Sequence, residues 1–286
     1  MNEIVSKEEI APSTFRYKIV HPKIARKRKA GQFVIFRLHE GGERVPLTVV
    51  DSDPEAGTVT LIFQAVGHST KELAEAEVGD SLLDLAGPLG KATHIENYGT
   101  ACVIGGGYGT APVLPIAAAL RDAGNNVIGI NGARSKDLVI LEKELRGICS
   151  RLEIATDDGS YGHHGFVTDV LKGLLEGGVK IDFVLAIGPG PMMRAVANLT
   201  REYNLPTMVS LNPLMVDGTG MCGGCRVEVG GETKFACVDG PEFDGHQVNF
   251  DLLMKRQGMY KPEEKQAAEH GPHCKLDERP MVYESA

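Results

Sequence analysis

The sequence predicts a multidomain chain: an antiparallel β-barrel over residues 1–97, an α/β domain with a parallel sheet over residues 98–211, and a small C-terminal domain over residues 212–260. Three observations support this division. Short β-branched segments broken by turns come first, strands alternating with helices follow, and a glycine- and cysteine-rich stretch comes last. Residues 261–286 are polar and punctuated by proline. They are expected to form an extended tail that is disordered or lies on another surface.

Composition narrows the functional classes. With 286 residues, 42% of them hydrophobic, the chain can build more than one core. Its formal net charge of −8 argues against nucleic acid or an anionic membrane surface as the main partner, because both would repel it. The basic run "HPKIARKRKAG" is interpreted as a solvated turn. No apolar run approaches the roughly 20 residues of a membrane span, and no secretory signal is visible, so a cytoplasmic protein is expected.

The first domain shows strand-like segments at regular spacing. They are "TFRYKIVH", "GQFVIFRLHE", "RVPLTVVDSDP" and "GTVTLIFQAVG". A short helix is expected in "HSTKELAEAE" with Ser69 or Thr70 as its N-cap, before "VGDSLLDLAGPLG" returns to strand and turn. The motifs "RVPLTV" and "GHSTKEL" could hold phosphate oxygens and the edge of a flat ring, although each alone is also compatible with an ordinary strand end or cap.

The second domain begins with "TACVIGGGYGTAPVLPIAAALRDAG", which predicts a buried strand, a glycine-rich turn and an apolar helix. Strands in "NNVIGINGA", "RLEIATDD", "KIDFVLAIGPG" and "PTMVSLN" then alternate with helices in "DLVILEKELRGIC", "VTDVLKGLLEGG" and "PMMRAVANLTREYN". This alternation predicts a parallel sheet with helices on both faces. Ligands bind such sheets at the carboxyl ends of the strands.

Two glycine-rich strand ends could line one crevice there. "GGGYGTAP" could let a diphosphate approach backbone N–H groups at a helix start, although it departs from the strict GxGxxG pattern and a purely structural turn stays open. "IGPGPMM" falls two β-α units later. Between them, Asp157 and Asp158 could act as acid and base, but turn chemistry is the preferred interpretation.

Three of the six cysteines lie within one short stretch, "VDGTGMCGGCRVEVGGETKFACVDG". In a reducing compartment such a cluster indicates metal binding more than disulfides. A structural zinc site is the alternative, disfavoured because no histidine has zinc-ligand spacing. Cys102 and Cys149 are expected to be plain buried thiols, and His270, His273 and Cys274 in the tail are interpreted as incidental.

The order of these motifs resembles the ferredoxin-NADP reductase superfamily. More narrowly, it is similar to the FAD and iron-sulfur electron-transfer subunits of dihydroorotate dehydrogenase B. It most closely resembles the family of small (alpha) subunits of NADH-dependent reduced ferredoxin:NADP oxidoreductases, also described as sulfide dehydrogenases. The resemblance covers residues 1 to about 260 and rests on "RVPLT", "GHST", "GGGYGTAP", "IGPGPMM" and the cysteine motif.

The resemblance implies two nucleotide sites. FAD would be bound in the first domain by Arg44, Pro46, Leu47, Thr48, Gln64, Val66, Ser69 and Thr70. NAD(H) would be bound in the second by Gly105, Gly106, Gly107, Gly109, Thr110, Arg134, Asp157 and Gly188. The run Arg134, Ser135, Lys136 could also grip a 2′-phosphate, so NADP stays possible.

The resemblance also implies a 2Fe-2S cluster. In dihydroorotate dehydrogenase B subunits the ligands follow C-x4-C-x2-C with a later cysteine, whereas this chain has Asp217 at the first position, then Cys222, Cys225 and Cys237. In the bifurcating small subunits an aspartate joins three cysteines. A carboxylate is a harder ligand than a thiolate, so a raised cluster potential is expected. The alternative is that Asp217 only forms a turn before Gly218.

The implied activity is electron transfer in a bifurcating oxidoreductase. Hydride would pass between NAD(H) and FAD, and single electrons would pass through the 2Fe-2S cluster to a larger flavin and 4Fe-4S subunit, similar to the glutamate synthase small chain. The two subunits would form a heterodimer that handles NADPH and ferredoxin, and no acid-base residue is required because the cofactors carry the chemistry. The alternatives are an electron-transfer subunit of dihydroorotate dehydrogenase or sulfide dehydrogenase, and a nucleotide-binding module with a zinc knot.

Overall fold

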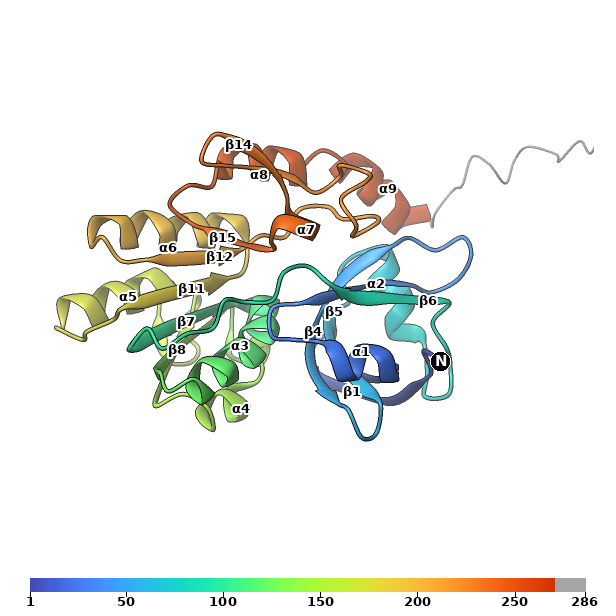
Figure 1. Ribbon diagram of the computed structural model, residues 1–286, viewed down its shortest axis with the longest axis horizontal. Coiled ribbons are helices and arrows are strands. Elements are labelled where there is room, and N and C mark those ends of the chain that lie inside the picture. Colours follow the sequence, from blue (N-terminus) through green and yellow to red (C-terminus); the bar gives the residue numbers. More distant parts are fainter. Residues whose placement is uncertain (271–286) are drawn as a thin grey trace, which may run out of the picture.

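The structure is a computed structural model that describes residues 1–270. An antiparallel sheet domain, blue to cyan in Figure 1, lies beside an α/β domain in green to yellow. Residues 212–260, which we call the C-terminal lobe, lie over both. The multidomain fold class expected from the sequence is therefore confirmed. His273 and Cys274 lie outside the described residues.

The first domain is a six-stranded antiparallel sheet with the strand order β1-β2-β5-β4-β3-β6. Alternate side chains point inward, and Tyr17, Phe36 and Phe63 are the largest residues of its buried core. Residues 22–27 form helix α1 rather than the expected solvated turn, because Ile24 is buried in that core. The elements are β1 (Ile4–Ala11), β2 (Thr14–Val20), α1 (Pro22–Lys27), β3 (Phe33–Arg37), β4 (Val45–Asp53), β5 (Thr58–Gln64), α2 (His68–Glu75) and β6 (Asp84–Leu89).

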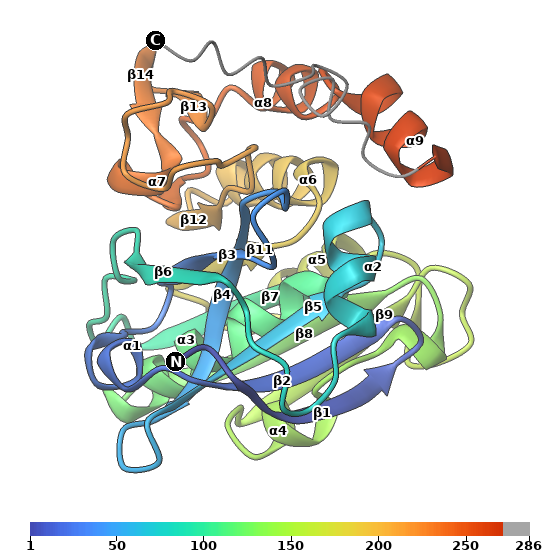
Figure 2. The same ribbon diagram turned by 90° about the vertical axis from the view of Figure 1, so that its right-hand side faces the viewer.

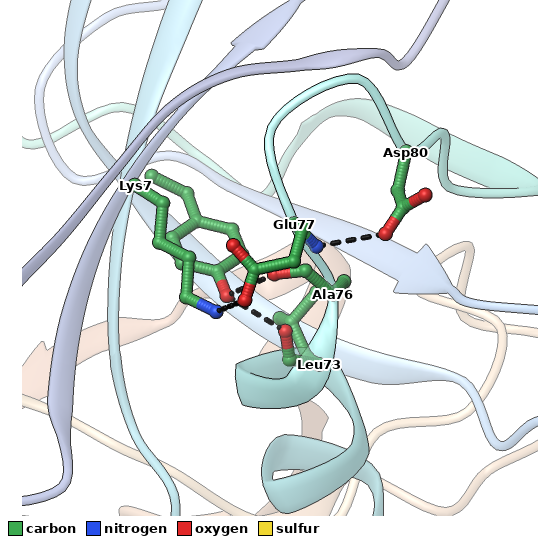
Figure 3. Close-up of polar contacts among 6 residues, drawn as sticks. Lys7, Leu73, Ala76, Glu77 and Asp80 are labelled. Carbon is green, nitrogen blue, oxygen red and sulfur yellow. Dashed lines mark hydrogen bonds and ion pairs between the residues drawn. The ribbon is translucent and has the colours of Figure 1, made fainter.

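Helix α2 is fastened to the sheet at its carboxyl end. The Tyr17 hydroxyl lies 2.9 Å from both the Leu73 and the Ala76 carbonyl oxygens, so its proton is shared between two acceptors at the end of the helix. Beside them, Lys7 pairs with Glu77 at 2.6 Å, and the Glu77 amide donates to the Asp80 carboxylate (Figure 3). Burial raises the pKa of Tyr17, so the hydroxyl stays a donor.

The second domain is a seven-stranded sheet with the order β10-β9-β8-β7-β11-β12-β15. Along β7, Cys102 and Ile104 pack toward α5 and α6, while Ala101 and Val103 pack toward α3, so both faces are covered. The elements are β7 (Thr100–Gly106), α3 (Thr110–Asp122), β8 (Asn126–Ala133), α4 (Glu142–Arg146), β9 (Arg151–Thr156), β10 (His163–His164), α5 (Val167–Glu176), β11 (Phe183–Ile187), α6 (Gly190–Glu202), β12 (Thr207–Ser210) and β15 (Glu242–Asp244).

The C-terminal lobe is small. The chain that forms it departs from the sheet of the second domain and later returns to that sheet. The lobe's own elements are β13 (Arg226–Val229), β14 (Glu232–Phe235), α7 (Ala236–Asp239) and α8 (Phe250–Gln257). Strand β15 follows α7 and pairs antiparallel with β12, so residues expected in the third domain complete the sheet of the second. Helix α9 (Lys261–His270) contacts α2 and corrects the expectation of an extended tail for its residues (Figures 1 and 2).

Two local expectations are also wrong. The helix expected in residues 137–149 shortens to α4, because Leu141 takes a left-handed φ of 58° and is buried with Ile140 between the two domains. The N-cap of α2 is Gly67 rather than Ser69 or Thr70. The Thr70 hydroxyl instead accepts from the Val66 and Gly67 amides, each at 3.2 Å.

Candidate functional site

A cavity of about 1020 Å³ lies where the two large domains meet. The first domain contributes strand residues, the second contributes the carboxyl ends of its strands, and the chain that enters the lobe closes one side. This is the position in which open α/β sheets bind ligands. Among the residues that line it are Phe33, Pro46, Thr48, Gln64, Gly106, Gly107, Gly109, Arg134, Asp157, Gly188, Leu211 and Asn212.

The two glycine-rich turns meet at the floor of this cavity. A Cβ on Gly109 would lie 2.2 Å from the Ile187 carbonyl oxygen, so the β7–α3 turn fits against the end of β11 only without a side chain. Gly107 has a φ of 57°, and a Cβ there would meet nothing within 4 Å. It leaves bare backbone facing the open space beside a helix start. Such a cradle fits a diphosphate group.

The predicted NAD(H) residues divide into lining and supporting groups. Six of them, Gly106, Gly107, Gly109, Arg134, Asp157 and Gly188, line the cavity. Gly105 and Thr110 support the turn from behind. A Cβ on Gly105 would lie 2.6 Å from the Thr110 Cα, and the buried Thr110 hydroxyl donates to Asn131 Oδ1 at 2.8 Å.

The predicted FAD residues are also divided. Pro46, Thr48 and Gln64 line the cavity, and Leu47 is buried in the core of the first domain. Val66 is 68% exposed, and Ser69 Oγ donates to the Glu43 carboxylate. The Arg44 guanidinium turns to the C-terminal lobe, where Nε donates to the Val216 carbonyl at 2.9 Å. The roles of Arg44, Leu47, Val66, Ser69 and Thr70 toward FAD stay predictions.

Three polar residues, Arg134, Ser135 and Lys136, directly follow β8, and only the first of them faces the cavity. Arg134 lines it, whereas Ser135 Oγ donates to Asp137 at 2.5 Å and Lys136 Nζ lies 5.4 Å from the centre of the Tyr161 ring. The Asp158 carboxylate accepts from Ser160, from its amide at 2.9 Å and from its hydroxyl at 2.6 Å, and these bonds lower the pKa of Asp158. Asp158 therefore forms a turn, as the preferred interpretation expects.

Of the four candidate cluster ligands in the lobe, Cys225 and Cys237 are in contact with each other. Cys225 and Cys237 are buried with their Sγ atoms 3.2 Å apart, and exposed Cys222 has its Sγ 3.4 Å from the Gly224 amide. The Asp217 carboxylate accepts from the amides of Thr219 at 2.9 Å, Met221 at 3.1 Å and Cys222 at 2.7 Å. These bonds, with that to Thr219 foremost, lower the pKa of Asp217 and keep it ionised.

The donor set fits an iron-sulfur cluster in chemistry, although within residues 1–270 no three or more His, Cys, Asp or Glu side chains are grouped to hold a single metal ion. Burial and the Cys225 thiol raise the pKa of Cys237 to about 12, so binding would release protons as thiolates form. Arg256 Nη2 donates to the Gly224 carbonyl at 3.1 Å, while its buried Nε has no acceptor.

Comparison with known proteins decides the family. A dihydroorotate dehydrogenase B (NAD+) electron-transfer subunit homologue of Thermotoga maritima is 49% identical over 265 residues, 93% of each chain. This chain belongs to the family of dihydroorotate dehydrogenase B electron-transfer subunits and their homologues. A second member, the electron-transfer subunit of Geobacillus thermodenitrificans, is 34% identical and covers 86% of this chain and 96% of its own. The family's iron-sulfur cluster binding domain matches residues 212–249.

A solved structure of an NADH-dependent reduced ferredoxin-NADP oxidoreductase, studied for flavin-based electron bifurcation, is also similar. The identity is 48%, the TM-score is 0.89, and the match covers 94% of this chain and 97% of that chain. The resemblance drawn from the motifs is thereby confirmed. Among the described residues, no helix has both the length and the apolar character needed to cross a bilayer.

Several cavity residues of this family member were not expected from the sequence. Tyr108, the one side chain inside "GGGYG", lies against the backbone of Thr48, and burial raises its pKa. Its position between glycines was an available signal. No sequence signal marks Phe33, Leu211 and Asn212 as cavity residues, because their place at the cavity depends on how the domains pack.

Proposed function

We propose that this chain is the FAD and 2Fe-2S subunit of an electron-bifurcating NADH-dependent reduced ferredoxin:NADP oxidoreductase. The observation that carries the proposal is the shared cavity. The first domain presents Pro46, Thr48 and Gln64 to the same space that receives the bare glycine turns of the second domain. A flavin ring held on one side and a nicotinamide held on the other would then meet within a single enclosure.

In this proposal, the residues of the chain bind the cofactors and align them with one another. Bound FAD and NADH supply hydride transfer, and a bound cluster supplies one-electron transfer. Gly107 and Gly109 admit the diphosphate, and Phe33 and Tyr108 help exclude water from the cavity. Asp217, Cys222, Cys225 and Cys237 would hold the cluster. No side chain has to take or give a proton.

We propose NAD(H) as the coenzyme. Ser135 is hydrogen-bonded to Asp137, and the Lys136 ammonium lies over the Tyr161 ring. In the cavity, a 2′-phosphate would therefore meet the Arg134 cation together with the Asp157 carboxylate, whose negative charge would repel it. Fluorescence titration should give at least about tenfold tighter binding of NADH than of NADPH. The Tyr161→Ala variant, which releases Lys136, should narrow that gap. Tighter binding of NADPH to the wild-type protein would contradict the assignment.

The partner in this proposal is a larger flavin and 4Fe-4S subunit, with which the chain forms a cytoplasmic heterodimer that reaches ferredoxin indirectly. The 48% identity to an oxidoreductase of this type supports this part of the proposal.

Purification under anoxic conditions tests the function. The native protein should carry FAD and iron, bleach at flavin wavelengths on addition of NADH, and then show the electron paramagnetic resonance (EPR) signal of a reduced 2Fe-2S cluster. A colourless protein containing zinc would instead support a nucleotide-binding module with a zinc knot. A protein that purifies alone and without FAD would refute the proposal.

A second candidate is the electron-transfer subunit of a dihydroorotate dehydrogenase, favoured by the family match over residues 212–249. The two candidates differ at Asp217, where that family's motif has cysteine. Assaying the native complex for dihydroorotate oxidation and for NADPH-linked ferredoxin reduction separates them. Dihydroorotate activity alone would favour the second candidate, and sulfide-dependent activity would favour a sulfide dehydrogenase.

A further inference from the structure

One short segment of the first domain touches both redox sites. Within residues 44–48, Pro46 and Thr48 line the cavity, while Arg44 reaches in the other direction. Its Nε donates to the Val216 carbonyl at 2.9 Å, and Val216 directly precedes Asp217. Five consecutive residues therefore connect the cavity with the turn that carries the proposed carboxylate ligand.

The same turn is seated on the first domain from a second side. Gly218 has a φ of 74°, and a Cβ there would lie 2.6 Å from Leu89 Cδ1 and 3.0 Å from Ile35 Cδ1. Ile35 pairs with Pro46 across β3 and β4, so this seat belongs to the strands that line the cavity. The place of the Asp217 turn is thus set by the first domain as well as by the lobe.

We propose that Arg44 is a positioning residue that fixes the Asp217 turn relative to the flavin cavity and so sets the electronic coupling between flavin and cluster. The inference rests on the proposed function. Electron tunnelling slows steeply with distance, so a turn held on the strands of the flavin side keeps the gap constant. Arginine suits this role because its guanidinium stays charged and donates in a fixed direction to a carbonyl.

The structure also predicts how the effect would spread. The Asp217 carboxylate holds the amides of Thr219, Met221 and Cys222, so a loosened Val216 would loosen the path toward Cys222. Backbone hydrogen exchange of this loop reports that change directly, and it does so in the protein stripped of iron as well as in the loaded protein.

The test compares four variants of the full chain in its native complex. Arg44→Gln removes the guanidinium, Arg44→Lys keeps the charge, and Gly218→Ala disturbs the seat without touching Arg44. Arg37→Gln is the matched control, because Arg37 lies on the adjacent strand and pairs with Asp84 at 2.7 Å within the first domain. FAD and iron contents are measured for each variant.

Arg44→Gln should raise hydrogen exchange of residues 219–222 about tenfold, the change expected for losing one hydrogen bond to a charged group. Cluster reduction after NADH addition should slow by a similar factor relative to flavin reduction in the same variant, and the EPR line shape should broaden. Gly218→Ala should reproduce these changes. Arg44→Lys should restore part of the wild-type behaviour, and Arg37→Gln should match wild type.

Unchanged exchange and cluster reduction in both Arg44→Gln and Gly218→Ala would overturn the proposal. If Arg44→Gln loses FAD, the Gly218→Ala variant and the exchange of iron-free protein still decide the matter. Failure of the proposed function is distinguished by cofactor content, because the wild-type protein itself would then lack FAD or iron.

Discussion

The parallel sheet and the C-terminal lobe are stabilised in different ways. Strands β7 and β11 are almost wholly buried and apolar, with helices on both faces. In the lobe, Cys225 and Cys237 are buried beside a small set of apolar side chains, among them Val227 and Phe250, and five glycines of residues 218–231 have positive φ. The sheet can fold on apolar burial alone, whereas the lobe needs its cluster for cohesion. Changes to the two regions should therefore have separable effects.

The largest effect is expected from Cys225→Ala. Losing a thiolate ligand should abolish the cluster, so iron content should fall to about a tenth or less, and residues 212–240 should become sensitive to protease. FAD binding should persist, because the sheet and the first domain keep their cores. The control is Cys149→Ala, which removes a buried thiol with a pKa raised to about 11 by burial and should leave iron content unchanged. Loss of FAD from Cys225→Ala would show that the two regions depend on one another.

A smaller effect is expected at the junction of the glycine turns. Gly109→Ala places a Cβ 2.2 Å from a backbone oxygen, which should cost about 3 kcal/mol of unfolding free energy and weaken NADH binding. In Gly107→Ala the Cβ meets nothing within 4 Å, so only the strain of a positive φ remains, about 1 kcal/mol. Thermal unfolding and NADH titration measure both. Equal losses would mean that the close approach to Ile187 does not matter.

Glu242, at the joint between lobe and sheet, should make stability depend on pH. Thr93 Oγ1 donates to its carboxyl at 2.6 Å, and burial raises the pKa of Glu242 to about 7. The folded protein thus holds this proton more tightly than the unfolded chain. The stabilisation is complete below about pH 4.5 and is lost as the pH rises through about 7.

Part of Glu242 reaches solvent, which limits the change to about 2 kcal/mol. Denaturant unfolding at several pH values should show the loss, and Glu242→Gln should flatten the profile in this window. A slope that persists in the variant would assign the pH dependence to other groups.

The smallest effect is expected in the first domain. Tyr17→Phe removes the hydroxyl shared by Leu73 and Ala76 and should cost about 1 kcal/mol of unfolding free energy. Tyr98→Phe is the control, because the Tyr98 hydroxyl makes an exposed bond to His94 at 3.1 Å and its loss should cost less. The EPR signal should be the same in both variants. A changed signal in Tyr17→Phe would mean that α2 influences the cluster.

The sequence predicted the elements whose cause is local. Buried strands, the helices between them and the glycine turns follow from apolar runs and missing side chains, and so does the shared crevice. Strand β15 and helix α9 could not be predicted in this way, since β15 has three residues and depends on pairing with β12, and α9 depends on contact with α2. The same limit applies to Arg44, because no local pattern shows a side chain turned to a carbonyl 172 positions away.

The backbone joint at the base of the lobe has an evolutionary consequence. The Leu211 amide donates to the Pro241 carbonyl at 2.9 Å, so the chain leaves and rejoins the sheet at almost the same point. The sheet closes this long excursion, and closure cost grows only slowly with loop length. Residues 212–240 therefore form an exchangeable cassette. A reductase of this design could gain or replace its one-electron module while the sheet kept its strand order, and the start of the module would still form one wall of the cavity through Asn212 and Met215.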